Sequence, residues 1–214
     1  MATAFLPAQL LHVAAQFASI DDVKGTMTGI LVRPAEGGGI QIDSVDGHCA
    51  FSVTCPDSKW ECKEPILLSA KAFKKRIPYA VAAQLENVNK VICGAPTDCT
   101  ATRILGGKPQ PGKNSELQFI QSIPALWQPA YAFEGDPAEQ YPKADQIAFN
   151  AAYLCDFLAE VKRYSTNDLV MMQRNGPINP AVFTAKMSGA WLDEVEMRFL
   201  LMPVQIGGAA ARAE

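Results

Sequence analysis

The stretch that decides the fold lies near the end of the sequence and reads Phe199-Leu200-Leu201-Met202-Pro203-Val204-Gln205-Ile206. It has the length of a β-strand and is apolar almost throughout. Proline cannot donate a ladder hydrogen bond, so Pro203 places the run at a sheet edge or at the last rungs of a ladder. A run this apolar is expected to be buried on both faces or to expose a docking surface. A closing core strand accounts for most of it, and the Met-Pro-Val ending is left as a candidate docking group.

The composition is that of a globular protein. The 214 residues are 49% hydrophobic and 19% charged, enough for one large domain or two small ones. No apolar run reaches the roughly 18 residues of a membrane span, and residues 1–5 lack the features of a secretory signal. A cytoplasmic protein without membrane partners is therefore expected. The net charge of -3 does not suggest nucleic acid, but a local basic face could still bind phosphate.

The six cysteines form no CxxC pair. Reduced and mostly buried thiols in a cytosolic protein are the favoured interpretation. The alternative is a zinc site made from His48, Cys49, Cys55 and Cys62, although their spacing is irregular for structural zinc. We expect no cofactor and no metal.

Hydrophobic periodicity predicts repeated units of one helix and about three strands, and hence an α+β protein. Helices are expected at residues 7–19, 70–77 and 150–163. Strands are expected at residues 26–33, 40–45, 48–54, 65–68, 84–88, 90–93, 99–105, 117–123, 146–149, 168–173, 181–185 and 196–206. Asp46-Gly47 is a strong hairpin signal between two of them.

The pattern also suggests domain boundaries. Residues 1–123 form a complete domain of two units, and the proline-rich residues 124–143 form a linker. Residues 144–207 form a half domain of one unit, and residues 208–214 form a tail.

Several stretches together resemble the bacterial DNA sliding clamp, the beta subunit of DNA polymerase III. Residues 28–32, followed by Asp46-Gly47-His48, resemble a strand and turn of that family's middle domain, and residues 66–73 resemble a strand and helix of the same domain. Residues 123–127 occupy the place of the family's linker. The strongest similarities are residues 149–154, which resemble the start of the last inner helix, and residues 199–206, which resemble the terminal strand.

The resemblance covers about residues 5–206 and implies the clamp fold, with antiparallel sheets outside and helices inside. It implies a processivity factor for DNA replication, and the short length fits a phage-encoded or otherwise reduced relative. Two positions depart from the family pattern: Cys49 replaces an arginine, and Ala125 replaces the linker aspartate.

A clamp needs a cationic inner surface that meets double-stranded DNA without reading its bases. The predicted DNA-facing residues are Lys71, Lys74, Lys75, Arg76, Lys162 and Arg163. The three lysines of the first group share one helix face at i, i+3 and i+4 spacing. The alternative is a solvated helix face. For the last two residues, cations complementing a helix C-terminus are the preferred interpretation, because Asp156 and Glu160 dilute the charge.

A clamp also needs an outer pocket for short peptides of the polymerase or of other replication proteins. The resemblance maps this partner-peptide pocket onto Ala50, Pro124, Pro129, Leu200 and Met202. Methionine repacks easily, and leucine or phenylalanine anchors would each gain about 1.5–3 kcal/mol on burial. For each residue alone, ordinary core packing is the alternative.

A ring in this family closes with twelve units. Three units per chain would need four chains joined head to tail, whereas two full domains per chain would need three. The unit count favours the tetramer. The rival hypotheses are a non-ring module that acts as a decoy or adaptor for replication proteins, and a clamp-fold protein with neither activity.

Enzyme mechanisms find little support. The sequence has only two histidines, and it lacks the P-loop, GxSxG, HExxH and dinucleotide-binding motifs. His48 and Cys49 are neighbours on a predicted strand, so their side chains should point to opposite faces and cannot form a nucleophile pair. We therefore expect a protein that is not an enzyme.

Overall fold

The structure is a computed structural model, and it describes residues 3–21, 24, 27–62, 65–77, 82–86, 90–94, 103–104, 147–173, 180–189 and 192–204. The elements of these residues are, in chain order, β1 (Thr3–Pro7), α1 (Ala8–Gln16), β2 (Gly29–Pro34), β3 (Ile40–Val45), β4 (Cys49–Cys55), β5 (Lys59–Trp60), β6 (Ile66–Ser69), the 3-10 helix η2 (Ala70–Phe73), β7 (Ala82–Glu86), β8 (Lys90–Gly94), β9 (Arg103–Ile104), α4 (Ala151–Tyr164), β10 (Met171–Gln173), β11 (Ala181–Gly189) and β12 (Leu192–Leu201).

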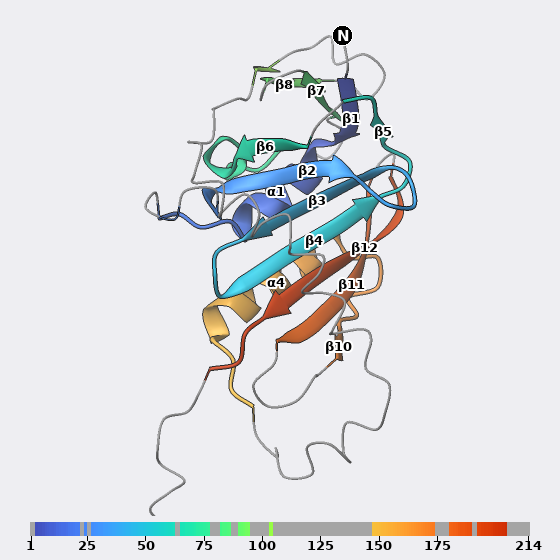
Figure 1. Cartoon of the computed structure of the whole chain (residues 1–214). Coiled ribbons are helices and arrows are strands. Elements are labelled where there is room, and N and C mark those ends of the chain that lie inside the picture. Colours follow the sequence, from blue (N-terminus) through green and yellow to red (C-terminus); the bar gives the residue numbers. More distant parts are fainter. Residues whose placement is uncertain are drawn as a thin grey trace, which may run out of the picture.

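A seven-stranded antiparallel sheet joins the two ends of the sequence. Its strand order is β10-β11-β12-β4-β3-β2-β6 (Figure 1). The central contact is between β12 and β4, where Phe199 pairs with Phe51 and Leu200 pairs with Ala50. Residues 199–201 of the apolar run therefore end a central strand, whereas the sequence predicted a strand over 196–206. Pro203 falls just after β12, where no ladder hydrogen bond is needed.

A second, five-stranded sheet has the order β5-β1-β7-β8-β9. The two sheets exchange strands. β1 precedes α1 but pairs with β7, whereas β6 precedes η2 but pairs with β2. Each sheet therefore depends on a strand from the neighbouring unit, so the first two units are expected to fold together.

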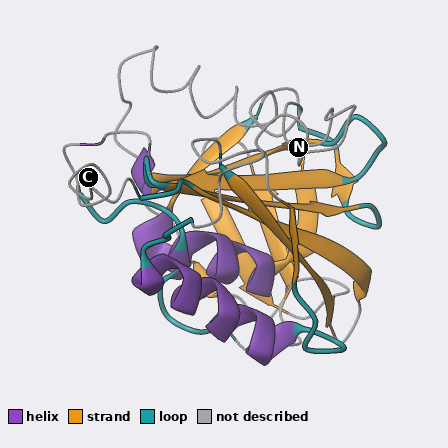
Figure 2. Ribbon diagram, turned by 90° about the horizontal axis from the view of Figure 1, so that it is seen from below, coloured by secondary structure: helices purple, strands orange, loops and turns teal. Residues whose placement is uncertain are grey.

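The two α-helices among the described residues, α1 and α4, lie side by side against one face of the strands (Figure 2). We call this face of the seven-stranded sheet the helix side. In α1, Leu10, Val13 and Ala14 recur at helical spacing in the sequence and are fully buried, so they form the apolar face of the helix. In α4 the side chain of Asn150 accepts a hydrogen bond from the Ala152 N–H at 3.0 Å, which caps the helix at the predicted start.

An aromatic cluster on the helix side connects the first and last units. Phe17, just after α1, stacks on Phe51 of β4 with ring centroids 5.1 Å apart. Phe157 of α4 stacks on Phe199 of β12 at 4.8 Å, and Phe17 also lies 5.1 Å from Phe199. Each of these side chains is at most 2% exposed. One core therefore holds together residues that are far apart in the sequence.

The α+β class and most predicted elements are confirmed, but the helix predicted at residues 70–77 is wrong. The structure has one 3-10 turn there, followed by bends at Lys74 and Lys75. Ser69 provides no side-chain cap, and Pro78 disfavours a helical conformation at the residue before it. Buried Ala70 and Phe73 match the three-residue period of a 3-10 helix.

Other local predictions were wrong or are unresolved. The sequence did not predict β1, and the strand expected at residues 146–149 is reduced to one bridge between Ala148 and Val204. Helical spacing from Leu154 and Val161 predicts Leu158 on the apolar face of α4, but Leu158 is 41% exposed. The strand at residues 117–123, the linker and the tail lie outside the described residues, so the domain boundaries stay a prediction. None of the described helices is long and apolar enough to span a membrane.

Candidate DNA-facing surface and peptide-docking row

The basic turn, residues 71–76, lies on the helix side. It follows β6 and packs against α1. Lys71, Lys75 and Arg76 are exposed, but Lys74 is half-buried. Burial lowers the pKa of Lys74, an effect that the nearby carboxylates of Asp156 and Asp46 oppose. The predicted sharing of one helix face is wrong because the α-helix is absent, yet three of the four cations do lie at the surface.

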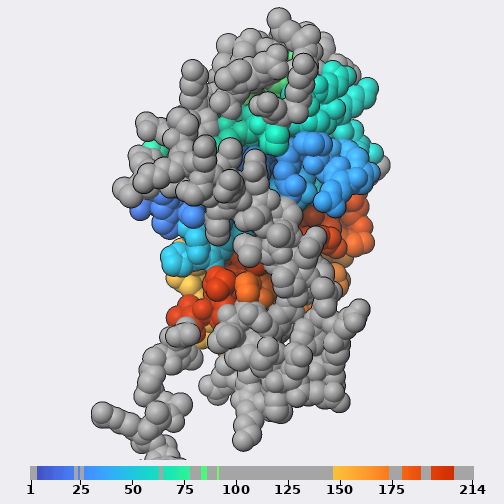
Figure 3. All heavy atoms as spheres, in the orientation of Figure 1, coloured from blue at the N-terminus to red at the C-terminus, as the bar shows by residue number. Residues whose placement is uncertain are grey.

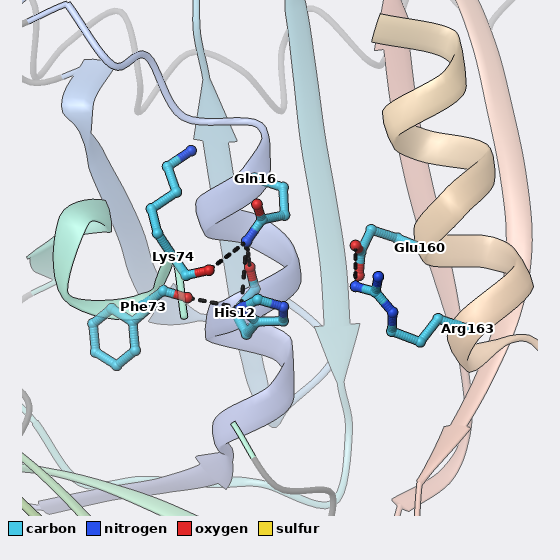
Figure 4. Close-up of polar contacts among 6 residues, drawn as sticks. All are labelled: His12, Gln16, Phe73, Lys74, Glu160 and Arg163. Atoms are coloured by element: carbon cyan, nitrogen blue, oxygen red, sulfur yellow. Dashed lines mark hydrogen bonds and ion pairs between the residues drawn. The ribbon is translucent and has the colours of Figure 1, made fainter. Parts of the chain in front are cut away.

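The polar face of α1 holds the basic turn in place (Figure 4). The Nδ1 atom of His12 lies 2.8 Å from the carbonyl oxygen of Phe73 and donates a hydrogen bond to it. The Gln16 side-chain amide donates to the carbonyl oxygens of His12, at 3.0 Å, and Lys74, at 3.5 Å. His12 is only 4% exposed. His12 and Gln16 lie four residues apart on one face of α1, but the sequence gives no sign that the basic turn is their partner.

The second basic pair lies in the last turn of α4. Lys162 is exposed, whereas the Nη1 atom of Arg163 is 2.6 Å from Oε1 of Glu160. Glu160 is 5% exposed, and burial raises the pKa of its carboxyl group while Arg163 opposes that rise. The charge of Arg163 is therefore partly neutralised, and both cations are placed to interact with the helix C-terminus.

An apolar row crosses four strands on the face opposite the helices. We call it the outer row, and it consists of Val45, Ala50, Leu200 and Val182. These residues are successive partners across β3, β4, β12 and β11. Side chains alternate along a strand, so Ala50 and Leu200 point away from the aromatic core that contains Phe51 and Phe199. All four are at most 6% exposed.

The outer row continues into the exposed end of the terminal run. Met202 is 44% exposed, and its N–H donates to the carbonyl oxygen of His48 at 3.1 Å. Figure 3 shows this face, on which atoms from the early and late parts of the sequence adjoin. The structure thus brings together three predicted pocket residues, Ala50, Leu200 and Met202, whereas Pro124 and Pro129 lie outside the described residues.

Two members of the row were missed by the sequence analysis. Val45 ends one strand and Val182 begins another, and both look like ordinary strand residues. Only the pairing register shows that they flank Ala50 and Leu200. The pairing of β12 with β4, between positions about 150 residues apart, carries no local sequence signal.

A buried ionic network lies beside the row. The Arg33 Nε atom is 3.0 Å from Oδ2 of Asp43, and the Gln41 side chain donates to Oδ1 of Asp43 at 3.0 Å and to Ser52 Oγ at 3.1 Å. Asp43 is fully buried, and burial raises its pKa while Arg33 opposes the rise. The network fills this part of the face with paired groups, which leaves the apolar row as the feature that suits a peptide.

The zinc alternative gains no support from the geometry. Among the residues that the structure describes, no three His, Cys, Asp or Glu side chains gather into a site for a metal ion. Cys49 and Cys55 are buried in β4, Cys62 is half-buried and Cys155 is exposed on α4. Burial raises the pKa of the Cys49 thiol well above its usual range, which makes it a poor nucleophile.

Comparison with known proteins identifies the fold. No protein-family model matches the sequence, and no curated protein matches it either. Solved structures do match. They include the Helicobacter pylori beta clamp in complex with diflunisal, with a TM-score of 0.60, 9% identity and 95% of this chain covered. The Bartonella birtlesii sliding clamp bound to griselimycin has a TM-score of 0.55 and 12% identity, with 96% of this chain covered. The beta chain of Streptococcus pneumoniae DNA polymerase III has a TM-score of 0.54 and 14% identity, with 94% of this chain covered.

The chain spans about two thirds of the length of these clamps: 66% of the Helicobacter pylori protein, 66% of the Bartonella birtlesii protein and 64% of the Streptococcus pneumoniae protein. The match includes both the helix layer and the antiparallel sheets, since it covers nearly all of this chain. The protein therefore has the fold of the bacterial DNA sliding clamp, the beta subunit of DNA polymerase III.

Proposed function

We propose that the protein is a sliding-clamp-like processivity factor that encloses duplex DNA and docks replication proteins without catalysing a reaction. One observation carries the proposal: nearly the whole chain matches sliding clamps in fold, with the described helices α1 and α4 on one face of the strands. In a closed ring of such chains, the helix side would face the DNA, and the face that carries the outer row and the exposed Met202 would point outward.

The charges of the helix side support DNA contact. Lys71, Lys75, Arg76 and Lys162 are exposed there, on the turn beside α1 and on α4. Side chains of this kind bind phosphate without reading sequence. Lys74 and Arg163, which interact with nearby carboxylates, would contribute less.

The outer row supports peptide docking. Three of its members, Ala50, Leu200 and Val182, come from three adjacent strands and lead to the exposed, adaptable side chain of Met202. A short peptide with leucine and phenylalanine anchors fits this chemistry, because only apolar side chains gain from contact with it. The partner would be a DNA polymerase or another replication protein.

A ring requires several copies of the chain. Three units per chain give a tetramer, and two full domains give a trimer, in both cases by head-to-tail contacts. The described elements match the three-unit pattern, with helices α1, η2 and α4, and so favour the tetramer.

The test is retention on closed circular DNA, compared with the same DNA made linear. A ring should remain on the circle at salt concentrations that remove a surface binder, and it should leave the linear form over the ends. The double variant Lys75→Glu/Arg76→Glu should bind linear DNA about tenfold more weakly and lower the slope of log affinity against log salt by about 2.

The matched control is Lys186→Glu/Arg198→Glu. It makes the same change of charge on the face opposite the helices, where these cations pair with Glu194 and Glu196. Equal losses in the two double variants would sink the assignment of the helix side to DNA. Equal retention on circular and linear DNA would favour a non-ring binding module.

A further inference from the structure

The last unit lacks the strand pairings that join the first two. We call β1, α1 and β2–β4 the first unit, β6, η2 and β7–β9 the second, and residues 147–149 with α4 and β10–β12 the third. In the first unit, β2 pairs with β3 on one side and with β6 of the second unit on the other. Strand β10 holds the same place after its helix, but among the described residues it pairs only with β11. It therefore forms a free edge of the seven-stranded sheet (Figure 1).

The segment before α4 lacks a pairing as well. Strand β1 precedes α1, and it pairs with β5 through Ala4 and Trp60 and with β7 of the second unit. Ala148 precedes α4, and it forms a bridge to Val204 after β12, which matches the pairing of β1 with β5. No described strand takes the place of β7. The third unit therefore lacks both pairings of the strand exchange that joins the first and second units.

The exposed flank of α4 corresponds to the flank of α1 that the second unit covers. His12, the fifth residue of α1, is 4% exposed and contacts the carbonyl oxygen of Phe73 in η2, and the eighth residue, Ala15, is fully buried. The fifth and eighth residues of α4 are Cys155 and Leu158, and both are exposed. The third unit thus leaves uncovered the helix flank that packs against a partner unit in the first.

The free edge is apolar. Met171 and Met172 of β10 are 61% and 52% exposed, whereas Ile30 and Val32 of β2 are fully buried. Residues 169–173 carry no charge, although soluble proteins usually protect a free edge with charged side chains, proline or a bulge. The edge is therefore suited to pairing with another strand.

The free edge and the helix flank belong to one surface. Met172 is the partner of Phe183 in β11, and the ring of Phe183 lies 6.3 Å from the ring of Phe157 in α4. Side chains of directly paired residues lie on the same face of a sheet, so Met172 lies on the helix side, as α4 does. A partner that pairs with β10 would consequently also reach α4.

The missing partner has the form of one unit, and the observations favour a second copy of this chain. Between β9 and α4 the sequence predicts a strand at residues 117–123 and a proline-rich linker but no helix, so this stretch does not supply a further unit. A second copy offers the same two unpaired segments and the same helix flank. The surface is therefore complementary to itself, as a twofold contact requires.

We propose that the third units of two copies exchange strands and form one complete domain. Strand β10 of each copy accepts residues 147–149 of the other copy, and the two α4 helices lie side by side as α1 and η2 do. The inference deepens the proposed function, and it rests on that function for the ring. It names a twofold contact at one junction of the ring, in place of a head-to-tail one, so that a tetramer would be a pair of such dimers.

The first experiment is crosslinking of the wild-type protein through Cys155 with a short bismaleimide. Packed helices lie about 8–10 Å apart, so the two Cys155 thiols should come within reach of the reagent. A covalent dimer should form, and Cys155→Ser, which keeps the size of the side chain, should lose it. A wild type that stays uncrosslinked, or a dimer that forms equally in Cys155→Ser, would overturn the proposal.

The second experiment measures the solution mass of Leu158→Glu by light scattering over a range of concentrations. Leu158 is exposed in the single chain, so the variant should fold, which circular dichroism checks. Its dimer should dissociate at concentrations at least about a hundredfold higher than the wild type does, because the twofold contact would bury the new carboxylate twice. The matched control is Ile20→Glu, at a side chain of the first unit that is 80% exposed, and it should keep the wild-type mass. Equal masses for the two variants would refute the strand exchange.

The results separate this contact from the clamp function. If Cys155 crosslinks and Leu158→Glu lowers the mass, but the wild type leaves circular and linear DNA at the same salt concentration, the clamp function fails and the contact stands. If the wild type is retained on circular DNA while Leu158→Glu keeps the wild-type mass, the clamp function stands and the strand exchange is wrong.

Discussion

The two faces of the seven-stranded sheet are built differently from the same strands. The helix side is a continuous core in which aromatic rings from both ends of the sequence stack against one another. The opposite face combines a narrow apolar row with a buried ionic network. Neighbouring residues such as Phe199 and Leu200 therefore serve different purposes. The first face provides stability and a platform for cations, and the second provides a candidate binding surface.

The largest expected effect is on the helix side. Phe199→Ala should lower the free energy of unfolding by about 3–5 kcal/mol, because it empties a site shared by Phe17, Phe51 and Phe157. Urea unfolding followed by circular dichroism measures the change. Leu200→Ala changes the next residue, which lies on the opposite face, and it should lower the free energy of unfolding by less than Phe199→Ala does. A larger loss for Leu200→Ala would contradict the division between the two faces.

The second-largest expected effect is a loss of stability when the buried ionic network around Asp43 is broken. Asp43→Ala should destabilise the protein by about 3 kcal/mol, since it leaves the partly buried Arg33 without its counter-charge. Asp43→Asn keeps the side-chain volume and one of the two acceptor oxygens, so it should lower the free energy of unfolding by less than Asp43→Ala does. If both variants unfold at the wild-type urea concentration, the network makes no contribution to this face.

Met202→Asp separates binding from stability. An exposed side chain tolerates a charge, so unfolding should change by less than about 1 kcal/mol. Peptide affinity should fall at least about tenfold, since the carboxylate would have to be desolvated beside the apolar row. Retention on circular DNA should not change. Fluorescence anisotropy with a fluorescein-labelled hexapeptide that contains adjacent leucine and phenylalanine residues checks the affinity. Loss of DNA retention would mean that the two surfaces are not independent.

The smallest effect is on pH dependence. Burial of Asp46 opposes ionisation, but hydrogen bonds from His48, Cys49 and Tyr153 outweigh it and lower its pKa. A carboxyl group whose pKa is lower in the folded state stabilises that state above its unfolded pKa, and the stabilisation is lost as the pH falls through the folded value. The Met202 N–H donates to the His48 carbonyl oxygen, in the β3–β4 turn that the Asp46 carboxylate holds by accepting from the His48 N–H. Protection of the Met202 amide should therefore persist at pH 5 and disappear only below about pH 3.8. Loss of protection between pH 5 and 7 would show that another group controls the turn.

The sequence predicted the elements better than their partners. Helical periodicity placed Leu10 and Val13 in the core, and alternation placed strand β3 at its observed bounds. Strand β1 was missed because its residues pair with β5 and β7, which lie far along the chain. Local patterns report burial and turns, whereas exchange of strands between units is decided by tertiary packing.

The candidate sites were predictable to different degrees. Ala50, Leu200 and Met202 were found through family resemblance, and the structure brings them together. The burial of Lys74 and the pairing of Arg163 with Glu160 could not be read from charge spacing, because both depend on how α1, η2 and α4 pack. Whether the remaining cations contact DNA stays a prediction.

The central claim is that several copies of this fold close into a ring. Light scattering at several protein concentrations tests it most directly by giving the solution mass of assemblies of the 23.1 kDa chain. The account predicts a stable tetramer, or a trimer if each chain supplies two full domains. A monomer at every concentration would contradict encirclement of DNA and would leave the outer row as the site of a non-ring binding module.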